Sequence, residues 1–347
     1  MVRPVQKDSV MTIRTILNLL RCVDVRRIWN LLLIFASFHL AAMRKKNIVW
    51  GYPYTLTIEP TNRCNLKCPE CPSGNGEMVR PLGLMSMERF ERILDEVCPE
   101  AFYLQLFFQG EPFINNSLPD MIRYAKTKRM YVSVSTNAHF LRMDVVERLL
   151  DSGLDQLIVS IDGLTQESYE RYRVGGSLNR VHEALELLTA ARGNRGRSAR
   201  TEITLQMLVT RDTEKQIPEL HALASRHSAS VALKTMQVYS IEGANTFLPE
   251  NPKYRRYNII DGELLPKSGM RNRCVRLWER SVITWDGVVV PCCFDKNAEH
   301  ALGSVERNSF HDIWQSEPYH DFRRRILGGR RNIPMCRNCT EGLKIYR

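Results

Sequence analysis

Three cysteines lie close together near residue 70, and their spacing is typical of a metal centre. Cys64, Cys68 and Cys71 stand in the run Cys-Asn-Leu-Lys-Cys-Pro-Glu-Cys, directly after a segment (54–59) with the composition of a β-strand. Structural zinc sites usually have four protein ligands, whereas three thiolates can bind three irons of a [4Fe-4S] cube and leave the fourth iron open. We therefore expect a reactive iron–sulfur centre, and half of a zinc site is the alternative interpretation.

A second group of cysteines lies near the C-terminus and offers four ligands. Its members have the spacing C-x17-C-x43-C-x2-C and are Cys274, Cys292, Cys336 and Cys339. An Asp286-Gly287 turn inside the apolar run 284–293 predicts a β-hairpin in the middle of the group. Spacing alone suits both a zinc ribbon and an iron–sulfur cluster. Cys293 is an additional thiol that could exchange roles with Cys292.

Short polar motifs follow several of the expected strands. Gly110 and Glu111 follow the segment 103–108, Asn137 follows 131–136 and Ser160 lies at the end of 156–161. Because functional groups in a barrel of parallel strands gather at the carboxyl ends of those strands, we expect these residues to lie near the first cysteine cluster.

The cysteine spacing C-x3-C-x2-C, followed by Gln-Gly-Glu-Pro at 109–112, resembles the radical S-adenosylmethionine (SAM) superfamily over roughly residues 50–347. The resemblance implies that Cys64, Cys68 and Cys71 hold a catalytic [4Fe-4S] cluster whose open iron binds SAM. It also implies that SAM is split to methionine and a 5′-deoxyadenosyl radical, which abstracts hydrogen from a substrate. An external electron donor such as flavodoxin or ferredoxin would be required.

The same resemblance assigns residues to SAM. The backbone at Gly110 and Glu111 would bind the SAM amino group, and Asn137 and Ser160 would contact its ribose and methionine parts. Arg173 would pair with the SAM carboxylate, a contact that suits a planar guanidinium.

Two positions depart from the family pattern: Gln109 stands where Gly is commoner, and Glu70 stands where an aromatic residue near the adenine is common. For substrate contacts the sequence offers a weaker set, in which a solvated loop is the alternative for each member: His139, Lys234, Arg255, Arg256 and Tyr257.

The second cysteine group resembles the twitch form of the SPASM extension, which carries one auxiliary [4Fe-4S] cluster. Its spacing is similar to that of radical SAM dehydrogenases acting on cyclitols. This resemblance favours iron over zinc at Cys274, Cys292, Cys336 and Cys339. It also implies an oxidoreductase in which the auxiliary cluster accepts an electron from the substrate radical.

Strand-like and helical segments alternate between residues 54 and 237, which predicts an α/β protein with a parallel sheet. Strands are expected at 54–59, 103–108, 131–136, 156–161, 203–210 and 231–237, with helices at about 86–97, 117–128, 143–152, 178–192 and 213–227. We expect a partial (β/α)6 TIM barrel followed by a small cysteine-rich twitch/SPASM domain. The expected organisation is an N-terminal segment (1–50), the barrel (51–245), a bridge (246–270) and the auxiliary-cluster domain (271–347).

The net charge of +11 is concentrated at the N-terminus, where residues 1–50 hold nine Lys and Arg against two Asp. The uncharged run 28–43 is shorter than the roughly 20 residues that span a bilayer. Its helix would lie either on the inner face of a membrane or against the barrel or a dimer partner. Clustered cysteines suit metal ligation in a reducing, cytoplasmic compartment better than disulfides.

Three classes of function follow from these patterns. The first is a radical SAM oxidoreductase that oxidises a small-molecule, glycan or lipid-linked substrate, such as a carbohydrate or cyclitol. The alternatives are a maturase that modifies a ribosomal peptide and a non-catalytic metal-binding scaffold. We expect no nucleic-acid partner, because the basic run at 323–331 lacks interleaved aromatic residues and is typical of a solvated surface.

Overall fold

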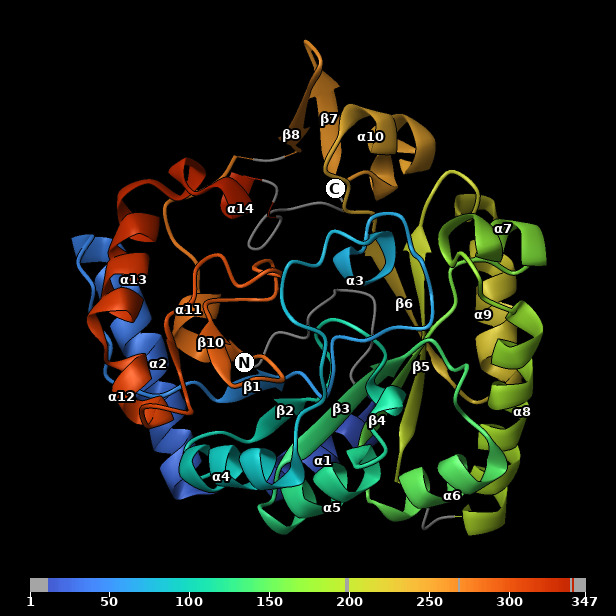
Figure 1. Ribbon diagram of the computed structural model, residues 1–347, viewed down its shortest axis with the longest axis horizontal. Helices are drawn as coiled ribbons and strands as arrows, with labels where there is room; N and C mark the ends of the chain where they lie inside the picture. Colours follow the sequence, from blue (N-terminus) through green and yellow to red (C-terminus); the bar gives the residue numbers. More distant parts are fainter. Residues whose placement is uncertain (1–11, 197–199, 268, 338, 340–347) are drawn as a thin grey trace.

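The computed structural model describes residues 12–196, 200–267, 269–337 and 339. Six parallel strands lie side by side in chain order and form the arc at the centre of Figure 1. They are β1 (Thr55–Ile58), β2 (Tyr103–Gln105), β3 (Tyr131–Thr136), β4 (Gln156–Ser160), β5 (Glu202–Val209) and β6 (Ser230–Thr235). Each begins within one residue of a predicted strand.

The connecting helices lie along the outside of this arc (Figure 1). They are α4 (Met87–Val97), α5 (Leu118–Thr127), α6 (Met143–Asp151), α7 (Gln166–Tyr172), α8 (Leu178–Arg195) and α9 (Ile217–Arg226). Side-chain oxygens cap the first turns of several of them, as Ser86 does for α4 and Ser177 for α8. Only α7 was not expected from the sequence. The strand–helix order is that of an open (β/α)6 barrel.

Most of the strands alternate apolar and polar residues, and both kinds are buried. Leu56, Leu104, Val134 and Leu157, from four successive strands, are fully buried. The alternate positions hold polar side chains such as Thr57 of β1 and Ser133 of β3, which are buried on the other face of the sheet. The buried faces fix the strands and so the positions of the loops at their carboxyl ends.

The cysteine-rich C-terminal part adds three strands to the same sheet. β9 (Arg280–Ile283) pairs in parallel with β1, β10 (Val288–Val290) pairs antiparallel with β9, and β11 (Gly303–Ser304) completes the edge. The predicted hairpin is present, with Gly287 at φ 86° in its turn. Pairing with β9 satisfies the free edge of β1, so the C-terminal part continues the barrel sheet.

Shorter elements complete the chain. A hairpin of β7 (Tyr257–Ile260) and β8 (Glu263–Pro266) projects beside α10 (Ile241–Phe247), at the top of Figure 1. The C-terminal helices are α11 (Arg276–Glu279), α12 (Phe310–Trp314), α13 (Glu317–Gly329) and α14 (Pro334–Arg337). A helical turn, α3 (Pro72–Asn75), follows the first cysteine cluster, and 3-10 turns lie at η1 (Pro112–Ile114), η3 (Glu214–Gln216), η4 (Pro252–Tyr254) and η5 (Arg330–Asn332).

Two N-terminal helices, α1 (Ile13–Cys22) and α2 (Val25–Arg44), pack on the body. Ile34, Phe38 and Ala41 of α2 belong to the main hydrophobic core. The ring of Phe38 meets that of Trp278 edge to face at 5.4 Å, and Trp278 Nε1 donates to the Ile48 carbonyl at 2.8 Å. The N-terminal segment is therefore bound to the C-terminal part of the chain as well as to the barrel.

Candidate functional site

The first cysteine cluster lies on the loop that leaves the carboxyl end of β1. Burial, with smaller contributions from Glu111, Cys68 and Cys71, raises the pKa of the Cys64 thiol to about 12. None of the three is in a disulfide. The Cys71 carbonyl accepts from the Gly74 N–H at 2.8 Å, which begins α3 and folds the loop back on itself. The fold thus brings the three predicted ligands together.

The chemistry of this donor set suits an iron–sulfur cluster. A single zinc ion needs sulfur ligands about 2.3 Å from one point, and no three His, Cys, Asp or Glu side chains in the described ranges meet in that way. A [4Fe-4S] cluster binds each thiolate at a different iron, so its sulfurs lie farther apart. Three free thiols on one loop match this requirement.

Arg173 lies against the first cysteine cluster. Its Nε donates to Oδ2 of Asp162 at 2.6 Å, and its Nη1 is 3.8 Å from Sγ of Cys68. Burial lowers the pKa of Arg173, but the charges of Asp162 and Cys68 outweigh this effect and raise it well above the usual value. A fixed positive charge therefore stands beside the thiols, where an anion could pair with it.

The Gly110-Glu111 motif packs directly on the cysteine loop. Gly110 has φ 73°, and a Cβ there would lie 2.5 Å from the Arg63 carbonyl oxygen, so only glycine fits. The Glu111 N–H donates to the same carbonyl at 2.8 Å. Gln109, where the family pattern favours glycine, places its Oε1 3.8 Å from Sγ of Cys71. The motif therefore lies beside the cluster, as the sequence predicted.

The Glu111 carboxylate is buried and accepts hydrogen bonds from other groups of the protein. It accepts from Thr136 Oγ1 at 2.6 Å, from the Asn137 N–H at 2.7 Å and from the Phe113 N–H at 3.3 Å. Burial raises its pKa to about 7, while these hydrogen bonds oppose the shift. Glu111 thus ties the loop after β2 to the end of β3.

Asn137 and Ser160 lie at neighbouring strand ends. Asn137 Nδ2 donates to Oδ1 of Asn65, within the cysteine loop, at 2.8 Å. Ser160 is buried at the last position of β4, in register with Gln206 of β5. Glu70 approaches Gly243 of α10, and burial raises the pKa of its carboxyl group. Asn137 therefore joins the cluster loop to β3, whereas Glu70 joins it to α10.

Three of the residues suggested for substrate contact have internal roles. His139 Nδ1 lies 2.9 Å from the Asn137 carbonyl, and its Nε2 accepts from the Ser177 N–H at 2.9 Å. Arg255 donates to the Pro249 carbonyl at 2.7 Å. Tyr257 is buried, which raises its pKa to about 12. These side chains hold loops in place.

The second group of cysteines also converges. Burial, together with the nearby thiols of Cys339 and Cys274, raises the pKa of Cys336 to about 12. The pKa of Cys292 is raised well above its usual value by burial and by neighbouring thiols that include Cys339 and Cys274. Arg330 Nη2 donates to Sγ of Cys339 at 3.2 Å. Four thiols and one guanidinium thus form a second site that suits a thiolate-bound cluster.

Cys293 has different neighbours from Cys292. Its Sγ accepts from Arg276 Nη1 at 3.1 Å, and its charge raises the pKa of Lys234 on β6. Cys292, by contrast, is within electrostatic reach of Cys274 and Cys339. These electrostatic neighbours favour Cys292 as the member of the four-thiol set.

Lys234 of β6 is within electrostatic reach of Asp162, beside the first cluster, and of Cys293, beside the second group. Burial lowers its pKa to about 8, Asp162 and Cys293 raise it, and Arg173 and Arg256 lower it. Arg256 Nε donates to Thr235 Oγ1 at 3.2 Å, while its buried Nη1 has no hydrogen-bond partner within the described ranges. Two cationic side chains, Lys234 and Arg256, therefore lie within electrostatic reach of each other, and Lys234 also reaches groups from both sites.

Sequence reasoning missed two acidic residues at strand ends. Asp162, two residues beyond β4, positions Arg173. Glu59 lies directly after β1, and its carboxylate accepts hydrogen bonds from Arg80 Nη1 at 2.8 Å and Nη2 at 2.7 Å in a buried ion pair. The Glu59 carboxylate also accepts from the Trp285 N–H at 3.1 Å. An acidic residue next to a buried strand was the only available signal for either.

The barrel, the thiol cluster at its carboxyl edge and the second thiol group together define an iron–sulfur enzyme of the radical SAM class. The family model for the radical SAM superfamily matches residues 58–224, and the SPASM model, an iron-sulfur cluster-binding domain, matches residues 274–340. The chain therefore contains a radical SAM domain followed by a C-terminal SPASM domain. These domains imply a [4Fe-4S] cluster with SAM and auxiliary iron–sulfur binding, as the sequence predicted.

Individual relatives are distant but cover most of the chain. The tungsten-containing aldehyde ferredoxin oxidoreductase cofactor-modifying protein of Pyrococcus furiosus is 26% identical, covering 82% of this chain and 86% of the relative. The PqqA peptide cyclase of Granulibacter bethesdensis is also 26% identical, covering 77% and 75%.

Solved structures share the fold. SuiB of Streptococcus suis bound to S-adenosylmethionine has a TM-score of 0.60 at 17% identity, covering 88% of this chain and 76% of SuiB. BtrN in complex with AdoMet and 2-DOIA has a TM-score of 0.50 at 17% identity, covering 85% and 95%. These likenesses confirm the predicted partial barrel with its C-terminal extension.

Proposed function

We propose that this radical SAM enzyme oxidises a C–H bond of a hydroxylated or anionic small molecule, such as a carbohydrate, cyclitol or lipid-linked substrate. When bound, SAM and the first cluster supply a hydrogen-abstracting 5′-deoxyadenosyl radical, and the auxiliary cluster supplies an electron acceptor. An external reductant such as flavodoxin or ferredoxin would serve the first cluster. The free thiols of all ten cysteines support a reducing, cytoplasmic compartment.

Each part of the site has a role in this proposal. Cys64, Cys68 and Cys71 hold the first cluster, and Cys274, Cys292, Cys336 and Cys339 hold the auxiliary one. Arg173, kept charged by Asp162, pairs with the SAM carboxylate. The backbone at Gly110 and Glu111, fixed against the cysteine loop, accepts the SAM amino group, while Asn137 and Ser160 border the rest of SAM.

We infer the substrate class from the surroundings of Lys234. Its ammonium group is within electrostatic reach of Asp162 on the SAM side and of Cys293 on the auxiliary side. Arg256, with a buried and unpartnered Nη1, adds a second cation there. A substrate held between the centres therefore meets hydrogen-bond donors that suit phosphate, carboxylate or hydroxyl oxygens.

A ribosomal peptide is the second candidate substrate. The specific support is the likeness to PqqA peptide cyclase, whose name states that it acts on a peptide. A peptide backbone would need carbonyl acceptors and N–H donors along the site, whereas Lys234 and Arg256 offer charged donors only. The cationic lining therefore favours the small-molecule substrate.

The experiment is to load the enzyme with iron and sulfide and to measure 5′-deoxyadenosine formation with panels of sugar phosphates, cyclitols and short peptides. Deuterated substrates that stimulate the reaction should transfer deuterium to 5′-deoxyadenosine. We expect stimulation by a hydroxylated or anionic small molecule, and its loss in Lys234→Met. Lys215→Met, at an exposed position, is the matched control. Stimulation by peptides alone, unaffected by Lys234→Met, would favour the maturase.

A further inference from the structure

The helix α2 carries apolar side chains on both sides: some pack on the protein beside buried polar residues, and others face outward. The side that packs on the protein contains the polar residues Arg27, Asn30 and Ser37, buried together with three apolar residues, Ile34, Phe38 and Ala41. The side that faces outward contains Trp29 (62% exposed), Leu32 (56% exposed) and other apolar residues. A surface helix of a soluble domain normally turns charged and polar residues outward.

Hydrogen bonds fix this orientation. The guanidinium of Arg27 donates to the carbonyls of Arg129 at 2.9 Å and Cys98 at 2.6 Å, and also to that of Lys128. Asn30 Nδ2 donates to the Tyr52 carbonyl at 2.8 Å and its Oδ1 accepts from the Tyr52 N–H at 2.9 Å. Rotating the helix to bury its outward apolar residues would break all of these bonds.

The outward apolar residues form one stripe along α2. Val25, Ile28, Trp29 and Leu32 recur at three- and four-residue spacing along α2, Met43 lies on the same side about three turns further on, and each is at least half exposed. On α1, Ile16, Leu17 and Leu20 are exposed as well. We call these eight side chains the outer apolar face. Soluble proteins seldom expose so many large apolar side chains together unless they bind something.

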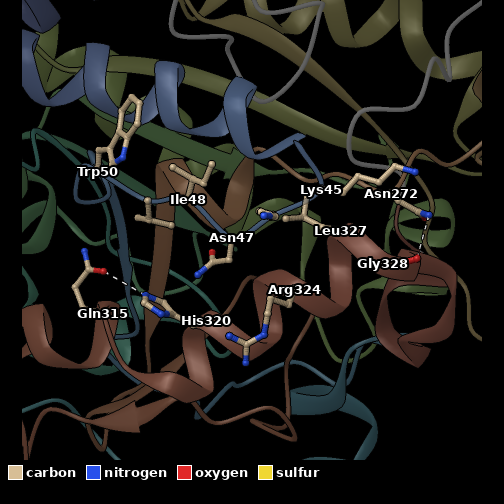
Figure 2. A pocket seen from close by; sticks show the side chains of 12 residues that line it. Lys45, Asn47, Ile48, Trp50, Asn272, Gln315, His320, Arg324, Leu327 and Gly328 are labelled. Carbon is tan, nitrogen blue, oxygen red and sulfur yellow. Dashed lines mark hydrogen bonds between the residues drawn. The ribbon is translucent and has the colours of Figure 1, made fainter. Parts of the chain in front are cut away.

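Basic residues border the outer apolar face. Arg44 is the last residue of α2, and Lys45 and Lys46 follow it. Residues 12–50 contain a single acidic residue, Asp24. Lys45 and Lys46 also line an open pocket of about 760 Å³ between the segment 45–50 and α13, together with His320 (Figure 2).

The positive charge of this pocket lies mainly on its two lysines. Arg324, on the far wall, pairs with Glu317 and Asp321. No ion pair of Lys45 or Lys46 occurs within the described ranges. The pocket therefore offers two ammonium groups to an anion at the end of the apolar stripe.

We propose that the outer apolar face docks on the surface of an anionic phospholipid bilayer. In this arrangement α2 lies in the plane of the membrane, Trp29 and Leu32 enter the interfacial region, and Lys45 and Lys46 contact lipid phosphates. Among the described helices α2 is long and apolar enough to cross a bilayer. Its hydrogen bonds to the barrel through Arg27 and Asn30 require it to lie flat instead.

Charge complementarity selects the bilayer over a second copy of the chain. A two-fold symmetric dimer built on this face would bring together two surfaces of the same positive net charge, since residues 12–50 hold seven Lys and Arg against one Asp, and like charges repel. An anionic membrane surface attracts these basic residues, by roughly 1 kcal/mol for each Lys or Arg near the surface. The membrane proposal does not depend on the reaction that the enzyme catalyses.

The test is flotation of the full-length protein with lipid vesicles. Two vesicle types are compared, phosphatidylcholine alone and phosphatidylcholine mixed with phosphatidylglycerol. We expect flotation only with the anionic vesicles, weakened at about 0.5 M salt because exposed charges are then screened. Trp29→Ser/Leu32→Ser and Lys45→Glu/Lys46→Glu should each bind at least about tenfold more weakly.

Matched controls separate docking from general surface effects. Ile260→Ser/Leu265→Ser removes two exposed apolar residues of the β7–β8 hairpin, and Lys215→Glu/Arg226→Glu reverses two exposed charges elsewhere. Both should float like the wild type, and thermal unfolding should show that all variants are folded. Wild-type protein that stays unbound to anionic vesicles would overturn the proposal. A dimer in sedimentation that Trp29→Ser/Leu32→Ser dissociates would also overturn it, because the face would then join two subunits.

Discussion

Arg173 donates from Nε to Oδ2 of Asp162 at 2.6 Å, and this ion pair holds the guanidinium 3.8 Å from the Cys68 thiol. Asp162 is fixed in turn by the Leu208 N–H, which donates to its Oδ1 at 2.6 Å. The charge that we assign to the SAM carboxylate is thus positioned by two strand ends, those of β4 and β5. We therefore expect a substitution of Arg173 to affect both the cleavage of SAM and the free energy of unfolding.

Replacing Arg173 with Met should reduce 5′-deoxyadenosine formation at least about tenfold, because a charge-assisted hydrogen bond to SAM is lost. It should also lower the free energy of unfolding by about 3 kcal/mol, since the buried Asp162 carboxylate loses its partner. Arg171→Met is the control, because Arg171 is exposed and pairs with Asp212 at the surface. Equal activity in the two variants, at equal iron content, would contradict the assignment.

Replacing Gly110 with Ala should disturb the contact between the Gly-Glu motif and the cysteine loop. The new Cβ would meet the Arg63 carbonyl at 2.5 Å in addition to adopting a left-handed backbone conformation. We expect a loss of more than about 2 kcal/mol in unfolding free energy and lower iron uptake. Gly76→Ala, at φ 84° with open space around it, should cost only about 1 kcal/mol in denaturant titrations. Similar losses in both variants would argue against the close contact.

The Glu59–Arg80 pair should stabilise the junction between the barrel and its C-terminal strands. Glu59 also accepts from the Trp285 N–H, and Arg80 Nε donates to the Lys296 carbonyl at 2.9 Å. Arg80→Met leaves a buried carboxylate unpaired and should lower the free energy of unfolding by about 3–5 kcal/mol. The double variant Glu59→Gln/Arg80→Met should recover part of this loss in chemical denaturation. If the double variant is no more stable than Arg80→Met, Glu59 and Arg80 do not stabilise the protein as a pair.

Cys292 and Cys293 should differ in iron binding. Cys292→Ala removes a thiol that lies within reach of Cys274 and Cys339, so the variant should lose the auxiliary cluster, about four irons per chain. Cys293→Ala removes a thiol bonded to Arg276 and should keep the iron. Iron and sulfide analysis after anaerobic reconstitution distinguishes the two. The opposite pattern would show that the two cysteines exchange roles.

Much of the barrel was predictable because its strands are short runs rich in apolar residues, separated by amphipathic helices. The segments expected at 131–136 and 156–161 form β3 and β4 almost residue for residue. The parallel pairing of β9 with β1 was not predictable, because it joins Thr55 to Arg280 across more than two hundred residues. Local composition says nothing about which free edge a distant strand will take.

In the site, too, local features were predictable from the sequence and long-range contacts were not. The cysteine spacing and the Gly110-Glu111 motif are local signals, and the fold brings them together. His139 was expected near substrate, but both its ring nitrogens face backbone groups at 2.9 Å, a tertiary arrangement that the sequence does not reveal. The outward apolar face of α2 was equally hidden, because the periodicity of a helix does not say which side faces the core.

The most direct test of the central claim is reductive cleavage of SAM. The reconstituted protein is reduced anaerobically with dithionite, and 5′-deoxyadenosine is measured by chromatography for the wild type, Cys68→Ala and the control Cys98→Ala. We predict that the wild type and Cys98→Ala form 5′-deoxyadenosine and that Cys68→Ala forms none. Product from Cys68→Ala at the wild-type level, or none from a wild type shown to carry both clusters with SAM and substrate panels present, would contradict the account.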